Sequence, residues 1–138
     1  MFRVTPAQNE AERAATAAAL GIPLSGAFTY RMTDEESGAL LGAAQFDIFS
    51  GYGEIYSLTE AAGHNDREAM FILGRATMNF IDLCGAHECR AADATASPAL
   101  LRALGFRVRA DGMFSADMTD MFSGHCGGHT VTLPKEEK

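Results

Sequence analysis

A histidine- and cysteine-containing string late in the sequence has the residue types of a metal site. FSGHCGGH spans Phe122–His129 and places His125, Cys126 and His129 around two adjacent glycines. Zinc prefers imidazole and thiolate ligands, and glycines let a chain wrap closely around an ion. The three residues are candidate zinc ligands, although their spacing matches no standard zinc module, and the other interpretation is a glycine-rich turn whose cysteine packs under the sheet and whose imidazoles are solvated. A fourth ligand would come from His64, Cys84, His87 or Cys89.

The thiol of Cys126 is also a candidate nucleophile. A nucleophilic cysteine needs a base within hydrogen-bond reach and a lowered thiol pKa. Adjacent residues of an extended segment point to opposite faces, so His125 is poorly placed to be that base. His129, across the two glycines, is the better partner. Cys84 and Cys89 fall instead on apolar stretches, which predict core positions for both thiols.

Two glutamates enclose a β-rich stretch and are candidate general bases. Glu54 and Glu60 begin and end this stretch, and a carboxylate takes a proton from an ammonium group when it lies within hydrogen-bond reach, directly or through one water. Regular strand alternation places Glu54, Tyr56, Leu58 and Glu60 on one face. That face would suit a cleft that recognises an amine, and it would equally suit an amphipathic sheet edge.

Periodicity and turn residues predict the elements that position these groups. Strands are expected at Phe2–Thr5, Ala27–Thr33, Ala39–Phe49, Glu54–Glu60, Glu88–Ala92, Phe106–Arg109 and Met113–Met118. Helices are expected at Ala11–Leu20, Arg67–Cys84 and Pro98–Leu104. The short connections predict an α+β (mixed α/β) domain, in which about three helices flank a twisted, mostly antiparallel sheet of about six to seven strands.

Length, composition and charge narrow the functional classes. The 138 residues predict a single domain over 1–138, with an irregular tail at 119–138. A formal net charge of -7 without a basic run argues against binding to nucleic acid or to an anionic membrane surface. No apolar run is long enough for a transmembrane helix, and the first residues do not look like a secretory signal. We therefore expect a cytoplasmic protein with reduced thiols.

A set of aromatic and methionine side chains near the end of the predicted domain has two interpretations. The first is packing against the sheet, and the second is an exposed surface that would support a homodimer or line a ligand pocket. The residues are Met113, Phe114, Met118, Met121 and Phe122.

The order of elements and three strings resemble the GNAT superfamily of acetyl-CoA-dependent N-acetyltransferases. The resemblance covers roughly Ala27–Met118 and rests on TDEESGALLGAA at Thr33–Ala44, on the helix-to-strand spacing around Gly85, and on SPALLRALGF at Ser97–Phe106. It implies the GNAT-like fold, acetyl-CoA as the cofactor, and an amine or a peptide as the acyl acceptor. Glu54 or Glu60 would then act as the base.

The resemblance also locates the cofactor loop, which in this family reads roughly Q/R-x-x-G-x-G/A before the long helix. Glycines let the backbone approach a pyrophosphate, whose charge is bound by free N–H groups at the helix start. Here the loop falls on 65–70, and its two glycine positions hold Glu68 and Met70. The residues implied in cofactor binding are Leu58, Thr59, His64, Asn65 and Arg67.

Three functions remain open from the sequence. The first is acetyl transfer from acetyl-CoA to an amine by a GNAT-fold enzyme with an altered loop. The second is a GNAT-like domain that binds a ligand or a partner without binding CoA, because the carboxylates of Asp66 and Glu68 repel a pyrophosphate. The third is a metal- or thiol-dependent activity at His125, Cys126 and His129.

Overall fold

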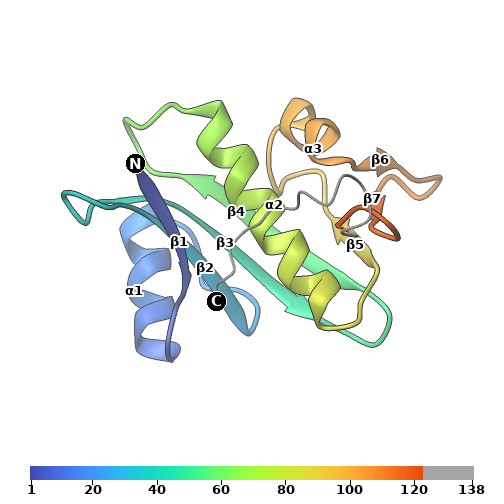
Figure 1. Cartoon of the computed structure of the whole chain (residues 1–138), viewed down its shortest axis with the longest axis horizontal. Coiled ribbons are helices and arrows are strands. Elements are labelled where there is room, and N and C mark those ends of the chain that lie inside the picture. The colour runs from blue at the N-terminus through green and yellow to red at the C-terminus, as the bar shows by residue number, and fades with distance from the viewer. Residues whose placement is uncertain (123–138) are drawn as a thin grey trace.

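A computed structural model describes residues 1–122 of the chain (Figure 1). The element order matches the order that the sequence predicts. The elements are β1 (Phe2–Pro6), α1 (Glu10–Leu20), β2 (Phe28–Asp34), β3 (Leu40–Ile48), β4 (Gly53–Glu60), α2 (Arg67–Leu83), β5 (Glu88–Ala91), α3 (Pro98–Leu104), β6 (Arg107–Val108) and β7 (Phe114–Asp117). Within these residues, no helix is long and apolar enough to cross a membrane.

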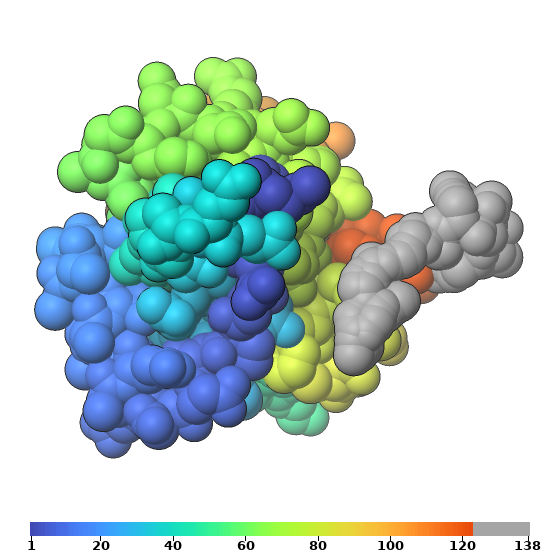
Figure 2. Space-filling model, turned by 60° about the vertical axis from the view of Figure 1, so that its left-hand side comes forward, coloured from blue at the N-terminus to red at the C-terminus, as the bar shows by residue number. Residues whose placement is uncertain are grey.

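The strands form one seven-stranded sheet in the order β1-β2-β3-β4-β5-β7-β6. Every neighbouring pair is antiparallel except β4 and β5, which are parallel. The mostly antiparallel sheet confirms the fold class that the sequence predicts. The turn between β2 and β3 folds against the N-terminus, where the amide of Glu35 donates to the Met1 carbonyl at 3.0 Å (Figure 2).

The helices lie on both faces of the sheet. α2 crosses the middle of the sheet, and α3 packs beside it (Figure 1). On β2 the side chain of Met32 is buried in the core with α2, whereas the next side chain towards the strand start, Arg31, donates to Thr16 of α1 at 3.0 Å. Since neighbouring strand residues point to opposite faces, α1 covers the face opposite α2.

The helix boundaries follow from their capping residues. Asn9, Asp66 and Ser97 each accept a backbone N–H from the first turn of the helix that follows. Side-chain oxygens at these positions satisfy amides that have no partner inside the helix. Gly21 and Gly105 end α1 and α3 in the left-handed conformation that glycine adopts without strain.

The core lies between α2, α3 and the sheet, and two glycines allow the close packing there. A Cβ on Gly53 would meet Ile81 at 2.5 Å, and a Cβ on Gly74 would meet Leu104 at 2.7 Å. Both partner side chains are completely buried. α2 therefore packs closely on β4, and α3 packs closely on α2.

The two described cysteines differ in burial. Cys89 is buried on β5, and this burial raises the pKa of its thiol. The prediction of a buried Cys84 is wrong, because Cys84 is exposed. The apolar stripe of α2 passes through the buried residues Leu73 and Thr77, but Cys84 lies one residue beyond the helix end at Leu83.

Candidate functional site

A β-bulge on β4 decides where the predicted general bases point. The pairing of β3 with β4 shifts between Gln45 and Phe46, whose partners are Ser57 and Ile55, so Tyr56 is an extra residue on β4. The bulge reverses the alternation, and Leu58 joins Ile55 in the core.

The expectation that Glu54, Tyr56, Leu58 and Glu60 share one face is therefore wrong. Tyr56 donates its hydroxyl to Asp47 at 2.9 Å, on the face opposite the core. Burial and this hydrogen bond raise the pKa of Tyr56 to about 12. Glu54 lies beside Asp47 in the ladder, whereas Glu60 contacts the start of α2. The two carboxylates do not face a common cleft.

The parallel junction of β4 and β5 is short and is closed by the turn after β5. The two strands pair only over Gly53–Ile55 and Cys89–Ala91. Beyond this stretch, Leu58 donates its amide to the Thr95 carbonyl at 3.1 Å, and the Thr95 hydroxyl donates to the Ile55 carbonyl at 3.2 Å. Thr95 is only 4% exposed. The backbone of β4 is thus already bonded where the resemblance places cofactor contacts.

Carboxylates of the chain itself bind the amides at the start of α2. Asp66 accepts the amide of Ala69 at 3.1 Å. Glu60 accepts the amide of Asp66 at 2.7 Å through Oε2, which also lies 2.7 Å from Nδ1 of His64. A helix N-terminus attracts negative charge, and here the chain supplies that charge.

The two loop positions that hold glycine in the family carry side chains with different surroundings. Glu68 is exposed on the first turn of α2. Met70 is 4% exposed, and its sulfur would lie 3.2 Å from a Cβ on Gly42. Met70 therefore fills the space between α2 and the sheet, so no open cradle for a pyrophosphate is present among these residues.

The remaining residues implied in cofactor binding are spread over the loop and the strand. Asn65 and Arg67 are exposed, and Thr59 pairs with Ala43 on β3. Arg67 lines an open cavity of about 390 Å³ between α2 and α3. The other lining residues are Glu68, Phe71, Ala99, Leu100 and Ala103. The cavity walls are mostly apolar, and the two charged side chains have opposite signs.

A hydrogen-bonded network occupies the strands on the other side of the β4–β5 junction. Glu88 accepts Nε of Arg90 at 2.9 Å and the hydroxyl of Ser115 at 2.9 Å. The contact with Arg90, followed by those with Ser115 and Arg109, lowers the pKa of Glu88. The guanidinium of Arg90 lies 3.7 Å from the centre of the Tyr52 ring. The charged and polar groups of this network bond to one another, so we interpret the network as stabilising the sheet.

The metal and thiol candidates divide between the tail and the described residues. His125, Cys126 and His129 lie outside the described residues. Within residues 1–122, no three His, Cys, Asp or Glu side chains form a group that could hold a metal ion. Nδ1 of His87 is 2.6 Å from Oδ1 of Asp82, and His64 contacts Glu60.

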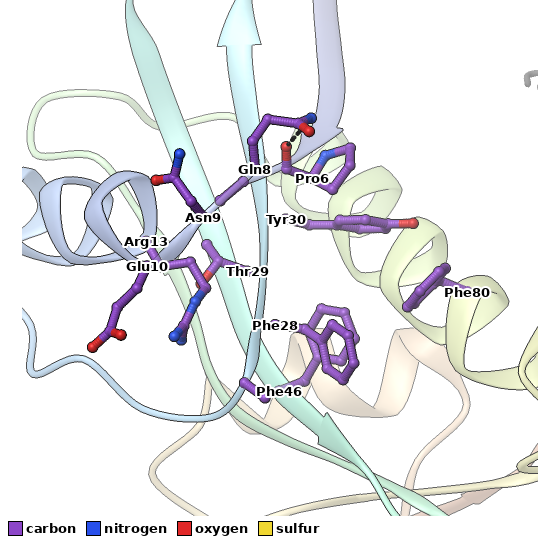
Figure 3. A pocket seen from close by; sticks show the side chains of 12 residues that line it. Pro6, Gln8, Asn9, Glu10, Arg13, Phe28, Thr29, Tyr30, Phe46 and Phe80 are labelled. Atoms are coloured by element: carbon purple, nitrogen blue, oxygen red, sulfur yellow. Dashed lines mark hydrogen bonds between the residues drawn. The ribbon is translucent and has the colours of Figure 1, made fainter.

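A cavity that the sequence does not predict lies between the end of β1 and the start of α1 (Figure 3). It measures about 260 Å³ and is lined on one side by aromatic rings and on the other by polar groups of β2 and α1. Alternating Phe28 and Tyr30 signal an aromatic face of β2. The sequence does not show that β1 ends early enough to leave part of this edge uncovered.

Comparisons with known proteins identify the fold. No protein-family model and no curated protein matches the sequence. A ribosomal-protein-alanine N-acetyltransferase from Escherichia coli is 13% identical with a TM-score of 0.67, over 86% of this chain and 94% of that one. A GNAT family N-acetyltransferase from Escherichia coli in complex with CoA is 15% identical with a TM-score of 0.56, over 68% of this chain and 60% of that one.

N-acetylglutamate synthase from Neisseria gonorrhoeae, complexed with coenzyme A and N-acetyl-glutamate, is 14% identical with a TM-score of 0.68. The match covers 86% of this chain and 35% of the synthase, so the chain spans about a third of that protein. The chain has the GNAT fold, as the strings around Gly42 and Gly105 predict. At these identities the likeness is one of fold.

The residues of this chain do not fit acetyl-CoA in the arrangement that the resemblance implies. The amide of Leu58 is bonded to Thr95, and the amides of Asp66 and Ala69 are bonded to carboxylates. Met70 is packed beneath the loop. A bound pyrophosphate would have to displace anionic groups and remain beside them.

Proposed function

We propose that this protein is a GNAT-fold binding domain that does not use acetyl-CoA as a cofactor. The observation that carries the proposal is the occupation of the start of α2 by Glu60 and Asp66. Two carboxylates already accept the amides of Asp66 and Ala69, and they would repel a pyrophosphate strongly where solvent is partly excluded. The closed β4–β5 junction supports the same conclusion.

Calorimetric titration of acetyl-CoA into the metal-stripped protein tests this proposal. We expect no binding up to millimolar acetyl-CoA, while an N-acetyltransferase that binds CoA gives a saturable signal in the same buffer. Micromolar binding by this protein would overturn the proposal, since it would show that acetyl-CoA binds despite the carboxylates at the start of α2.

A matched pair of variants separates charge from packing. Glu60→Gln removes a carboxylate that contacts the loop amide, and Glu88→Gln removes one from the network on β5. If charge alone excludes acetyl-CoA, Glu60→Gln will gain measurable binding and Glu88→Gln will not. If packing excludes it, neither variant will bind.

The second candidate is acetyl transfer to an amine, which the likeness to CoA-bound GNAT structures favours. In that case the Arg67 cavity would lie beside the cofactor, and Glu54 or Glu60 would act as the base. A positive acetyl-CoA titration would lead to an amine screen with Glu54→Gln and Glu60→Gln. Loss of activity in one variant alone would identify the base.

A further inference from the structure

The cavity at the β1–α1 junction lies on an uncovered part of the edge of β2. β1 ends at Pro6, which pairs with Tyr30. The amide of Ala7 still donates to the Thr29 carbonyl at 2.9 Å, and Asn9 then caps α1. The start of β2 around Phe28 therefore has no β1 residue beside it. A ligand seated at this edge can reach side chains from both faces of the strand.

Aromatic rings form the α2 side of the cavity (Figure 3). Phe28 and Phe46 stack with their centres 5.5 Å apart, and Phe80 meets the Phe28 ring edge-on at 6.0 Å. Tyr30 lies 5.5 Å from Phe80 and completes the group. Phe28 remains 39% exposed at the rim, so one ring of this packed group is open to a further planar partner.

Polar groups with unused donors form the α1 side. Thr29 is 3% exposed, and its hydroxyl has no hydrogen-bond partner among the described residues. Arg13 donates Nη1 to the Gly26 carbonyl at 2.7 Å, and the described residues offer its other N–H groups no acceptor. Figure 3 shows Thr29 and Arg13 together beside α1, with the Glu10 carboxylate directed away from the rings.

A buried hydroxyl without a partner is unfavourable, so its presence calls for an explanation. Valine has the shape of threonine and would remove the unpaired group. Thr29 lines the cavity beside the half-buried cation Arg13, and this pair suits an anionic acceptor that enters from outside. A cationic ligand head would be repelled by Arg13, and a neutral head would leave the charge of Arg13 without a counter-charge.

We propose that this cavity binds a small aromatic carboxylate, whose anionic group is held by Thr29 and Arg13 and whose ring packs on Phe28. A volume of about 260 Å³ lies below the usual range for drug-sized ligands, so a ligand with a single ring is the better fit. The site adds a ligand to the binding role proposed above but does not depend on it. The cavity sits at the β1–β2 end of the sheet, away from the β4–β5 junction.

Titration of phenylacetate into the full chain, followed by amide chemical shifts in NMR, tests the proposal. We expect saturable shifts at Arg13, Phe28 and Thr29, with no change at the amides of α3. Phenethylamine, which replaces the carboxylate by an ammonium group, and ethylbenzene, which has no polar head, should both bind at least tenfold more weakly.

Two threonine variants form the matched control. Thr29→Val removes the hydroxyl and should weaken phenylacetate binding by about tenfold or more, as expected for a hydrogen bond to a charged group. Thr29→Ser retains the hydroxyl and should keep most of the affinity. Because the Thr29 hydroxyl has no protein partner, Thr29→Val is expected to fold at least as well as the natural chain.

Three outcomes would overturn the proposal. These are no saturable shifts at several millimolar phenylacetate, equal affinity for phenethylamine, and unchanged phenylacetate affinity in a folded Thr29→Val variant. The acetyl-CoA titration has no bearing on any of them, so failure of the proposed function and failure of this site are separately visible.

Discussion

At the β4–β5 junction the buried Thr95 donates its hydroxyl to Ile55, whereas at the β1–α1 junction the equally buried Thr29 hydroxyl has no partner among the described residues. The first region is where the resemblance places a cofactor, yet its polar groups are satisfied by the chain. The second holds none of the cofactor contacts that the resemblance implies, yet it keeps unused donors beside a cavity. We therefore expect unmatched buried donors, rather than the fold, to mark where this chain binds a ligand.

The largest expected effect comes from opening the packing between α2 and α3. Leu104 is fully buried against Gly74, and Leu104→Ala should lower the free energy of unfolding by about 2–5 kcal/mol, since it opens a cavity between α2 and α3. Leu83→Ala, at a leucine that is 74% exposed, should change it by less than about 0.5 kcal/mol. Urea unfolding measures both variants, and a similar loss in both would contradict the tight packing of α3.

The second prediction compares the two buried threonines directly. Thr95→Val removes a hydrogen bond and leaves the Ile55 carbonyl without this donor, so it should destabilise the fold by about 1–3 kcal/mol. Thr29→Val removes an unpaired hydroxyl, and its free energy of unfolding should stay equal or rise. Equal losses of stability in the two variants would show that the Thr29 hydroxyl has a hydrogen-bond partner in solution. The two threonines would then no longer differ.

The sequence predicts local structure well because the signals are local. Asn9, Asp66 and Ser97 cap helices that their neighbours already favour. The string that ends in Leu104, Gly105 and Phe106 marks the end of α3, and β6 begins directly after it. These features depend on a few adjacent residues, and such features are the ones that sequence patterns record.

The site could not be predicted in the same way, since its geometry depends on pairing between distant segments. The bulge at Tyr56 arises from the register of β3 against β4, and it separates Glu54 from Glu60. The bond from Leu58 to Thr95 joins the middle of β4 to the turn after β5. Glu68 and Met70 did indicate an altered loop, but only the fold reveals that Glu60 reaches the amide of Asp66.

The third prediction tests whether Asp66 acts through its cap or through its charge. Asp66→Ala should lower the free energy of unfolding by about 1 kcal/mol, because the Ala69 amide loses its acceptor. Asp66→Asn keeps an acceptor and should change stability little. Thermal unfolding at neutral pH measures both. If Asp66→Asn is as unstable as Asp66→Ala, the charge at α2 is the more important contribution.

The smallest expected effect is a change in stability at alkaline pH. Each region has one tyrosine that reports on it, Tyr30 at the β1–α1 cavity and Tyr56 on β4. Burial raises the pKa of Tyr30 to about 12, and burial together with Asp47 raises that of Tyr56 to about 12. Both phenols stay protonated in the folded chain while the unfolded chain begins to ionise near pH 10. Each phenol therefore contributes stability that is complete below about pH 10 and is lost as pH rises towards 12.

Tyr30→Phe should weaken that pH dependence of the free energy of unfolding without changing the titration of Tyr56, which is followed by ultraviolet absorbance. Asp47→Asn should lower the pKa of Tyr56 and leave that of Tyr30 unchanged, because Oδ2 of Asp47 accepts the hydroxyl of Tyr56 while Oδ1 accepts only the backbone amide of Ala27. A shift of both tyrosines in Asp47→Asn would mean that the two regions are coupled through the sheet, and the cavity at β1–α1 could not then be treated as independent of the β4–β5 junction.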